Sequence, residues 1–368
     1  MMFAGIETLR RRRSSKWVTH PPDVLPAFVA ELDVDLAPPI REALVEAIEL
    51  GDVGYTEPAG LFEAFAGFAR RRLGFAPDPA RMLLVPDVMA GIVEVLRVLT
   101  EPGDGVVITP PVYGPFFDGI PEAGRRIVEV PIADGELDLD ALDAACAAGA
   151  RALLISSPHN PTGRVFERAH LEQVAMLAAR HDVVVLADEI HASLTLPGAV
   201  HTSFGALGDS RTVVLTSASK AFNLPGLKCA IAIAGSDALR REVDRLPPEV
   251  RYRAGMLGVI ASQAALEHGD AWLDELLAAL DANRHRVTAL LAEHLSGVVY
   301  HPPDASFLAW LDCRSLGLGD DPAATFLERG RVALESGLRF GAPGRGFARL
   351  NFGTSEALLS DAVRRMAL

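Results

Sequence analysis

Cysteine is scarce in this sequence, and its placement excludes the common cysteine-based sites. The three cysteines, Cys146, Cys229 and Cys313, lie far apart in a chain of 368 residues. Zinc sites place their cysteines about two to four residues apart, and disulfide frameworks use an even number of them. We therefore expect no metal site and no disulfide bonds, and reduced thiols favour a cytoplasmic location.

The sequence also lacks long apolar runs and an excess of positive charge. No apolar stretch approaches the roughly 20 residues of a membrane-spanning helix, and the arginines at 10–13 are followed by Ser14 and Ser15 rather than by the apolar core of a signal peptide. The net charge is −13, whereas nucleic acids and membrane surfaces attract positively charged proteins. We expect neither a nucleic-acid partner nor a membrane partner.

Short, continuous apolar runs alternate with helical patterns through the middle of the sequence. A run such as Val-Val-Val-Leu-Ala at 183–187 fits a strand that is buried on both faces. The seven runs lie at 81–85, 105–109, 126–130, 152–156, 183–188, 212–216 and 229–234, and the helical patterns lie at 58–73, 88–99, 113–123, 139–147 and 168–180. This alternation predicts an α/β fold with a mostly parallel, seven-stranded sheet covered by helices.

The two ends of the sequence follow a different pattern. Residues 1–38 are irregular and punctuated by proline, and a long helical pattern runs from about residue 255 to about residue 295. Strands are expected after it at 298–301, 306–311 and 348–351, and helices at 322–336 and 356–366. We predict a large domain at 39–255 and a small α+β domain made of 256–368 together with 1–38.

Three polar segments follow predicted strands. They are Ser-Ser-Pro-His-Asn-Pro-Thr-Gly at 156–163, Ala-Asp-Glu-Ile-His at 187–191 and Thr-Ser-Ala-Ser-Lys-Ala-Phe-Asn at 216–223. Ligands of open α/β sheets bind at the carboxyl ends of the strands. The three segments are therefore the candidate site.

Two residues of these segments suggest a cofactor with an aldehyde and a cationic ring. Asp188 ends an apolar run, where an unpaired carboxylate is costly; it can cap a helix or face a buried cation such as a pyridinium nitrogen. An isolated lysine is usually a surface charge, but a lysine of lowered pKa at position 220 can form an imine with an aldehyde. The hydroxyls of Ser217 and Ser219 and the charge of Lys228 can hold a phosphate.

In this order, the three segments resemble those of fold-type-I enzymes that use pyridoxal 5′-phosphate (PLP), in the class I and II aminotransferase family. The Asn-Pro-Thr-Gly motif contains Asn160, the Asp-Glu-Ile-His motif begins at Asp188, and the Ser-x-Ser-Lys motif ends at Lys220. The segments Lys-Trp at 16–17, Asp-Val-Leu-Pro at 23–26, Val-Ala-Glu-Leu-Asp at 29–33 and Gly-Tyr-Thr at 54–56 are similar to the cystathionine β-lyase (C–S lyase) branch, the MalY/PatB type. The resemblance continues to Arg-Leu-Asn-Phe-Gly at 349–353.

The resemblance implies PLP as the cofactor and gives roles to the residues around its ring. Lys220 resembles the lysine that carries the cofactor and moves the substrate proton, and Asp188 resembles the partner of the pyridine nitrogen. Tyr113 resembles the aromatic residue that stacks on the ring, and these three residues are the expected catalytic groups. Asn160 resembles the donor to the phenolate oxygen, and His191 stands where many relatives have a tyrosine of similar role.

The resemblance places the phosphate at the start of the helix that follows Asp87. Free backbone N–H groups and the positive end of the helix dipole suit a phosphate. Because Asp87 can be the N-cap, we assign phosphate binding to the backbone of Val88 and Met89. Ser217 and Lys228 are expected to complete the phosphate site.

The resemblance also implies how the substrate is held. Arg349 resembles the arginine that binds the substrate α-carboxylate, because a guanidinium matches a carboxylate with two parallel hydrogen bonds. Ala30 is expected beside the substrate. Tyr55 resembles a tyrosine that reaches the cofactor and substrate of the neighbouring subunit, which implies a homodimer.

The expected reaction is β-elimination at a carbon–sulfur bond, in which cystathionine or a related cysteine S-conjugate yields a thiol, pyruvate and ammonia. Amino-group transfer is the alternative, because both reactions use the same catalytic residues. Phe28 and Phe166 stand where the lyase branch usually has tryptophan, and these departures can mark an altered substrate.

Two functions of other classes stay open. A PLP-fold regulatory or binding protein without turnover would not need Lys220, Asp188 and Arg349, which are all present. A nucleotide-binding α/β protein would carry a P-loop or a Gly-x-Gly-x-x-Gly motif after a strand, and the sequence has neither.

Overall fold

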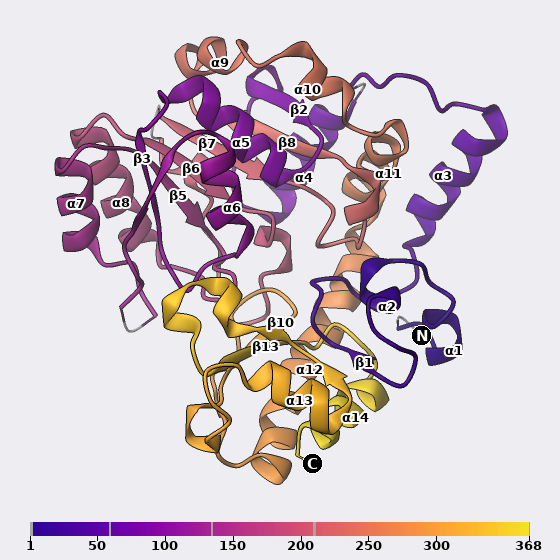
Figure 1. Ribbon diagram of the computed structural model, residues 1–368. Coiled ribbons are helices and arrows are strands. Elements are labelled where there is room, and N and C mark those ends of the chain that lie inside the picture. Colours follow the sequence, from indigo (N-terminus) through magenta and orange to yellow (C-terminus); the bar gives the residue numbers. More distant parts are fainter. Residues whose placement is uncertain (1–2, 59, 134, 209–210, 368) are drawn as a thin grey trace.

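A seven-stranded sheet forms the centre of the molecule in the computed structural model, which describes residues 3–58, 60–133, 135–208 and 211–367 (Figure 1). From edge to edge its strands are β2 (Met82–Val85), β8 (Ala230–Ala234), β7 (Thr212–Thr216), β6 (Val184–Asp188), β5 (Ala150–Ser156), β3 (Gly105–Ile108) and β4 (Arg126–Glu129). β8 is antiparallel to both of its neighbours, and the other neighbouring pairs are parallel. The predicted α/β fold with a mostly parallel sheet is therefore confirmed.

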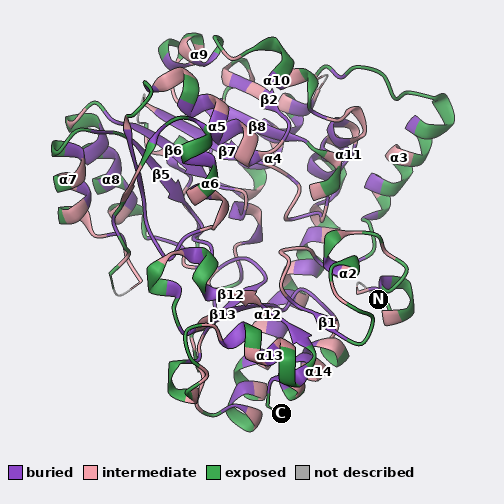
Figure 2. Cartoon of the chain, in the orientation of Figure 1, coloured by how far each residue is buried: buried purple, intermediate pink, exposed green. Residues whose placement is uncertain are grey.

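Helices cover both faces of this sheet because successive side chains of each strand point to opposite faces. On β3, Val106 and Ile108 belong to one buried cluster, and Val107 belongs to the other. The cluster of Val106 includes side chains of α5 (Val88–Leu99), α6 (Pro115–Glu122), α9 (Asp237–Val243) and α10 (Pro248–Tyr252). The cluster of Val107 includes side chains of α4 (Leu61–Arg72), α7 (Leu139–Ala147), α8 (Arg168–Arg180) and α11 (Met256–His268). Figure 2 shows the buried strands between these layers.

A second, antiparallel sheet lies below the first in Figure 1. Its strands are β12 (Glu335–Ser336), β13 (Phe347–Asn351), β10 (Leu308–Asp312) and β9 (Val299–Tyr300), and the helices of this part of the chain are α12 (Asp270–His294), α13 (Pro322–Gly330) and α14 (Glu356–Met366). The chain start contributes α1 (Ile6–Leu9), α2 (Ser15–Val18) and β1 (Leu25–Pro26), which pairs with β11 (Val332–Ala333). The proposed domain boundary at 255 stays a prediction.

Two of the predicted helices are wrong in extent. The helical pattern of 255–295 forms two helices that meet at Gly269, where a Cβ atom would lie only 2.4 Å from the carbonyl oxygen of Ala265. The helix predicted at 322–336 ends at Gly330, because Arg331 adopts a left-handed conformation with φ of 54°. The chain then continues as β11 and β12, so Glu335 lies on a strand rather than on a helix.

α5 approaches the sheet closely, and Gly91 makes this approach possible. A Cβ atom at Gly91 would lie 2.7 Å from Leu215 Cδ2 and 3.1 Å from Val85 Cγ2. Both neighbours are buried in the core, so they have little room to move. The position of the first turn of α5, which borders the candidate site, therefore depends on a glycine here.

We expect Gly91→Val to lower the free energy of unfolding by about 1–3 kcal/mol more than Gly67→Val does, because only the first overpacks the core. Gly67 is the matched control in α4, where a Cβ atom would meet only the end of the Arg71 side chain at 3.4 Å. Thermal unfolding of both variants measures the difference. Equal melting temperatures would contradict the role of Gly91.

Candidate active site

A cavity of about 260 Å³ lies at the carboxyl ends of β5, β6 and β7. It brings together most of the residues that the sequence singled out: Ala30, Val88, Met89, Tyr113, Asn160, Asp188, His191, Ser217, Lys220 and Lys228. A neighbouring cavity of about 300 Å³ shares Ala30, Tyr113 and Lys220 with it and adds Arg349. The parallel strands explain this convergence, since their carboxyl ends lie at one edge of the sheet.

Asp188 is a buried carboxylate with little to balance its charge. It ends β6, and its Oδ1 accepts one hydrogen bond, from the backbone N–H of Ile190 at 3.1 Å. Burial raises the pKa of Asp188 to about 7, against an ordinary value of 3.8. A cation placed beside it in the cavity would restore the charged form.

Lys220 lies in the turn after β7, and its amine donates a hydrogen bond to the carbonyl oxygen of Ala30 at 2.8 Å. Burial, together with the positive charge of Arg349, lowers the pKa of the Lys220 amine to about 8, although Asp188 acts in the opposite direction. About a tenth of this amine is therefore neutral at pH 7, far more than for a lysine of ordinary pKa. Only the neutral amine can attack a carbonyl carbon or accept a proton.

Asn160 and Arg349 are hydrogen-bonded to each other across the two sheets. Arg349 Nη1 donates to Asn160 Oδ1 at 3.1 Å, which leaves the amide NH₂ of Asn160 to donate elsewhere. Arg349 Nη2 donates to the carbonyl oxygen of Phe28 at 3.1 Å, and the guanidinium carbon lies 4.9 Å from the centre of the Phe340 ring. Arg349 Nε is buried and has no hydrogen-bond partner among the described residues, so the guanidinium keeps donor capacity for a ligand.

The first turn of α5 forms another end of the cavity. Asp87 Oδ1 caps this helix by accepting from the N–H of Ala90 at 2.8 Å, and its Oδ2 pairs with the Lys228 amine at 3.0 Å. Ser217 Oγ donates to the carbonyl oxygen of Cys229 at 2.6 Å. The protein groups expected to bind the phosphate thus lie around one end of the cavity. Ser217 and Lys228 already have protein partners, which a phosphate would share or replace.

Two further polar side chains border the cavity without strong partners. His191 Nδ1 is buried and has no hydrogen-bond partner in the described part of the chain, and burial lowers the pKa of His191 to about 3, so the ring is neutral. Tyr113 packs edge-on against Phe116 with ring centres 5.7 Å apart, and burial raises the pKa of its phenol.

These groups fit PLP. Among the described residues, Asp188 forms no ion pair and His191 Nδ1 has no hydrogen-bond partner, and the amide of Asn160 has its NH₂ to donate. Lys220 supplies an amine of lowered pKa, and the start of α5 suits a phosphate. Each functional group of the cofactor thus has a matching residue, although the individual roles stay predictions.

Three residues from the sequence analysis lie elsewhere or differ in their surroundings. Tyr55 is 90% exposed and lies outside both cavities, where its ring contacts Tyr252. Phe28 lines the second cavity, whereas Phe166 is fully buried behind His159 and lines neither. Of the two departures from tryptophan, only Phe28 touches the candidate site directly.

Sequence reasoning missed Glu335 and Arg339, which also line the second cavity. Glu335 pairs with Arg349 in the register of β12 and β13. The helix predicted through 322–336 concealed this strand, and a strand assignment from the Val-Ala-Leu-Glu-Ser segment at 332–336 would have exposed it.

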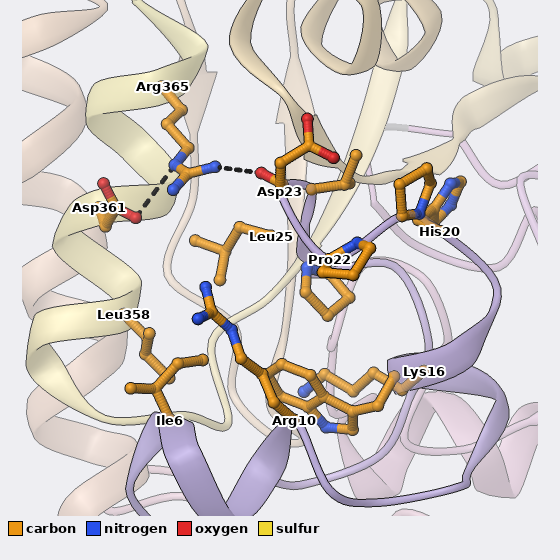
Figure 3. A pocket seen from close by; sticks show the side chains of 14 residues that line it. Ile6, Arg10, Lys16, His20, Pro22, Asp23, Leu25, Leu358, Asp361 and Arg365 are labelled. Carbon is orange, nitrogen blue, oxygen red and sulfur yellow. Dashed lines mark hydrogen bonds and ion pairs between the residues drawn. The ribbon is translucent and has the colours of Figure 1, made fainter.

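A separate cavity of about 150 Å³ lies between the chain start and α14 (Figure 3). Arg365 donates there to Asp361 Oδ2 and to the carbonyl oxygen of Asp23, both at 3.0 Å. Lys16 is buried and pairs with Asp33 at 2.9 Å. These four charged side chains already have partners, and none of the three polar segments at 156–163, 187–191 and 216–223 contributes a residue to this cavity.

Comparisons with known proteins agree with the geometry. The family described as "Aminotransferase class I and II" matches residues 41–366. The chain is 45% identical to the "Putative cystathionine beta-lyase" of Mycobacterium leprae, over 98% of this chain and 96% of the relative, and 35% identical to the cystathionine beta-lyase of Corynebacterium glutamicum, over 100% and 99%. It matches the structure of a "putative plp-dependent beta-cystathionase" from Corynebacterium diphtheriae with a TM-score of 0.96 and 34% identity, over 100% of this chain and 98% of that one.

No helix of the described residues has the length and apolar character to cross a membrane. Nor do those residues contain a cluster of three or more His, Cys, Asp or Glu side chains that could hold a metal ion.

We expect Asp188→Asn to stabilise the cofactor-free protein progressively as the pH rises from about 4 to about 7. The folded-state pKa of about 7 lies above the ordinary 3.8, so the folded protein binds more protons than the unfolded chain in this range, and its stability falls with rising pH. An amide does not titrate and escapes this loss, which amounts to about 1–4 kcal/mol by pH 7.5.

Thermal unfolding of the two proteins across this pH range measures the effect. Asp143→Asn is the control, because a hydrogen bond from His181 lowers the pKa of that exposed carboxylate and no gain is expected. If the difference in melting temperature between the wild type and Asp188→Asn did not change with pH, Asp188 would be charged in the folded protein and balanced by a positive group.

Proposed function

The chain belongs to the class I and II aminotransferase family, and on this premise we propose that it is a PLP-dependent carbon–sulfur β-lyase. It cleaves cystathionine or a related cysteine S-conjugate to a thiol, pyruvate and ammonia. The observation that carries the proposal is the meeting of Lys220, Asp188 and Arg349 in two adjoining cavities at the carboxyl ends of the strands. Relatives named cystathionine beta-lyase, similar over nearly their whole length, support elimination rather than amino-group transfer.

The residues of the first cavity would hold the cofactor and keep it reactive. When bound, PLP supplies an electron sink that stabilises negative charge at the substrate α-carbon. Asp188, as a buried carboxylate, would keep a proton on the ring nitrogen. Asn160 and His191 would face the phenolate oxygen, and the start of α5 would take the phosphate.

Lys220 and Arg349 would act on the substrate itself. Arg349 would bind the α-carboxylate with its buried guanidinium, which fixes the orientation of the amino acid. Lys220, once its amine is free, would remove the proton from the α-carbon as a general base, for which a pKa of about 8 is suitable. Loss of the thiolate from the β-carbon would follow, since it relieves the negative charge at the α-carbon.

We propose a homodimer because the chain exposes apolar side chains around α3 (Pro38–Leu50) and the segment after it. This helix stands out from the body at the right of Figure 1. Ile48 is 62% exposed, Leu50 75%, Val53 65% and Tyr55 90%. Exposed apolar clusters of this kind are typical of protein–protein contacts. If a second copy of the chain covers this cluster, Tyr55 would lie against the neighbouring subunit. The three buried, unpaired cysteines support a cytoplasmic location.

Lys220→Ala should lower the rate of pyruvate release from L-cystathionine by at least about 100-fold, even at saturating PLP, because Lys228 is paired with Asp87 and His191, with a pKa of about 3, is too weak a base. Pyruvate and free thiol are followed together, without a keto acid. Lys228→Ala is the comparison: it should weaken cofactor binding but recover turnover as PLP is added. Retained activity in Lys220→Ala would refute its role, and conversion of the cofactor to its amino form after one turnover would indicate an aminotransferase.

Leu50→Glu should shift the protein from dimer to monomer at micromolar concentration, because it places a charge within the proposed contact. Sedimentation velocity measures the change. Met176→Glu is the control, as Met176 is 63% exposed on α8, away from α3. A wild-type protein that sediments as a monomer would contradict the proposal.

A further inference from the structure

Opposite charges lie side by side on the wall of the second cavity, where the proposed mechanism uses neither of them. Glu335 Oε1 lies 3.2 Å from Arg339 Nε, and both residues line this cavity together with Lys220 and Arg349. The Glu335 side chain is only 19% exposed, whereas that of Arg339 is 63% exposed. The pair thus extends from the buried end of the cavity toward its opening.

Both groups keep capacity for a ligand. The terminal nitrogens of Arg339 make no hydrogen bond to any described residue; its ion pair to Glu335 runs through Nε. Glu335 Oε2 faces Arg349 Nη2 at 3.8 Å, which is longer than a hydrogen bond. Among these three charges, Arg349 is the one assigned to the substrate α-carboxylate. Glu335 and Arg339 then remain as one negative and one positive group on the same wall, Glu335 beside Arg349 and Arg339 more exposed.

The backbone holds this pair against the loop that carries Tyr113. A Cβ atom at Gly114 would lie 2.5 Å from the carbonyl oxygen of Arg339, so the two segments are in direct contact. The N–H of Val112 donates to the carbonyl oxygen of Phe340 at 3.0 Å. The backbone around Arg339 is therefore packed against the loop that carries Tyr113.

Apolar side chains share this cavity with the charged groups. Phe28, Phe340 and Pro115 line it together with Arg349, Glu335 and Arg339. Their surfaces suit the methylene groups and sulfur atom of a thioether. One cavity thus offers a guanidinium for the α-carboxylate, apolar surfaces and a pair of opposite charges.

We propose that Glu335 and Arg339 bind the ammonium and carboxylate groups at the far end of a thioether whose leaving group is itself an α-amino acid. Glu335 accepts from the distal ammonium, and Arg339 donates to the distal carboxylate. The enzyme thereby prefers substrates such as L-cystathionine over S-alkyl cysteines, which end in an uncharged group. This inference rests on the proposed β-lyase function and names the residues that set its substrate preference.

Steady-state kinetics with L-cystathionine and S-methyl-L-cysteine test the inference. Arg339→Gln should lower the ratio of kcat/KM for L-cystathionine to that for S-methyl-L-cysteine by about three- to fivefold, the loss expected for one contact of a mostly exposed charge. The change should appear mainly in KM, since the distal groups do not react. Arg339→Lys, which keeps the charge, should retain most of the preference.

Arg345→Gln is the matched control, since Arg345 pairs with Asp320 and lies outside the cavity. It should leave the ratio as in the wild type. An unchanged ratio in Arg339→Gln, with S-methyl-L-cysteine still cleaved, would overturn the inference and leave the lyase function intact. A wild-type holoenzyme that releases no pyruvate from either thioether would instead overturn the proposed function.

Discussion

Hydrogen bonds to the backbone of residues 28–32 join the two sheets around one site. From the small sheet, Arg349 donates to the carbonyl oxygen of Phe28, and the amide of Asn351 donates to the carbonyl oxygens of Val29 and Glu31, both at 2.7 Å. From the large sheet, Lys220 donates to the carbonyl oxygen of Ala30. A segment near the start of the chain thus fixes the distance between the reactive amine and the guanidinium. These side chains bind carbonyl oxygens of a segment that belongs to neither sheet, so the segment links the two.

The site collects positively charged side chains, although the protein as a whole is acidic. The chain carries a net charge of −13, yet the two cavities collect Lys220, Lys228, Arg339 and Arg349. The cofactor and the substrate both bring anionic groups, and the cavity offers its positive charges where these groups would lie. Of the acidic residues that line the two cavities, Asp87 and Glu335 pair with Lys228 and Arg339, whereas Asp188 forms no ion pair among the described residues, and its burial suits a charged ring nitrogen rather than solvent.

Much of the fold and the first cavity was predictable, because both depend on local patterns. Continuous apolar runs identified all seven strands of the large sheet, and strand ends placed Asn160, Asp188 and Lys220 at one edge. The break at Gly269 was missed, although glycine commonly ends a helix; the close approach of Phe222, whose Cε1 would lie 2.5 Å from a Cβ atom there, is visible only in the structure. The apolar periodicity also does not show that the helix ends before Arg331 and that a strand follows. For this reason the position of Glu335 on a strand was missed. The place of Tyr55 in a neighbouring site depends on a second subunit and stays a prediction.

The residues that the sequence predicted are those proposed for proton removal, and the residues that it missed are those proposed to face the leaving group. In the proposed reaction, proton removal at the α-carbon would use the amine of Lys220 and the buried carboxylate of Asp188, which lie in motifs at the ends of strands, and the guanidinium of Arg349, which lies within β13. The wall that would face the leaving group comes from Phe28 near the chain start and from Glu335, Arg339 and Phe340 near the chain end. Under the proposal, substrate preference would therefore depend on contacts between segments that are distant in sequence, whereas proton removal would depend on motifs that a sequence shows directly.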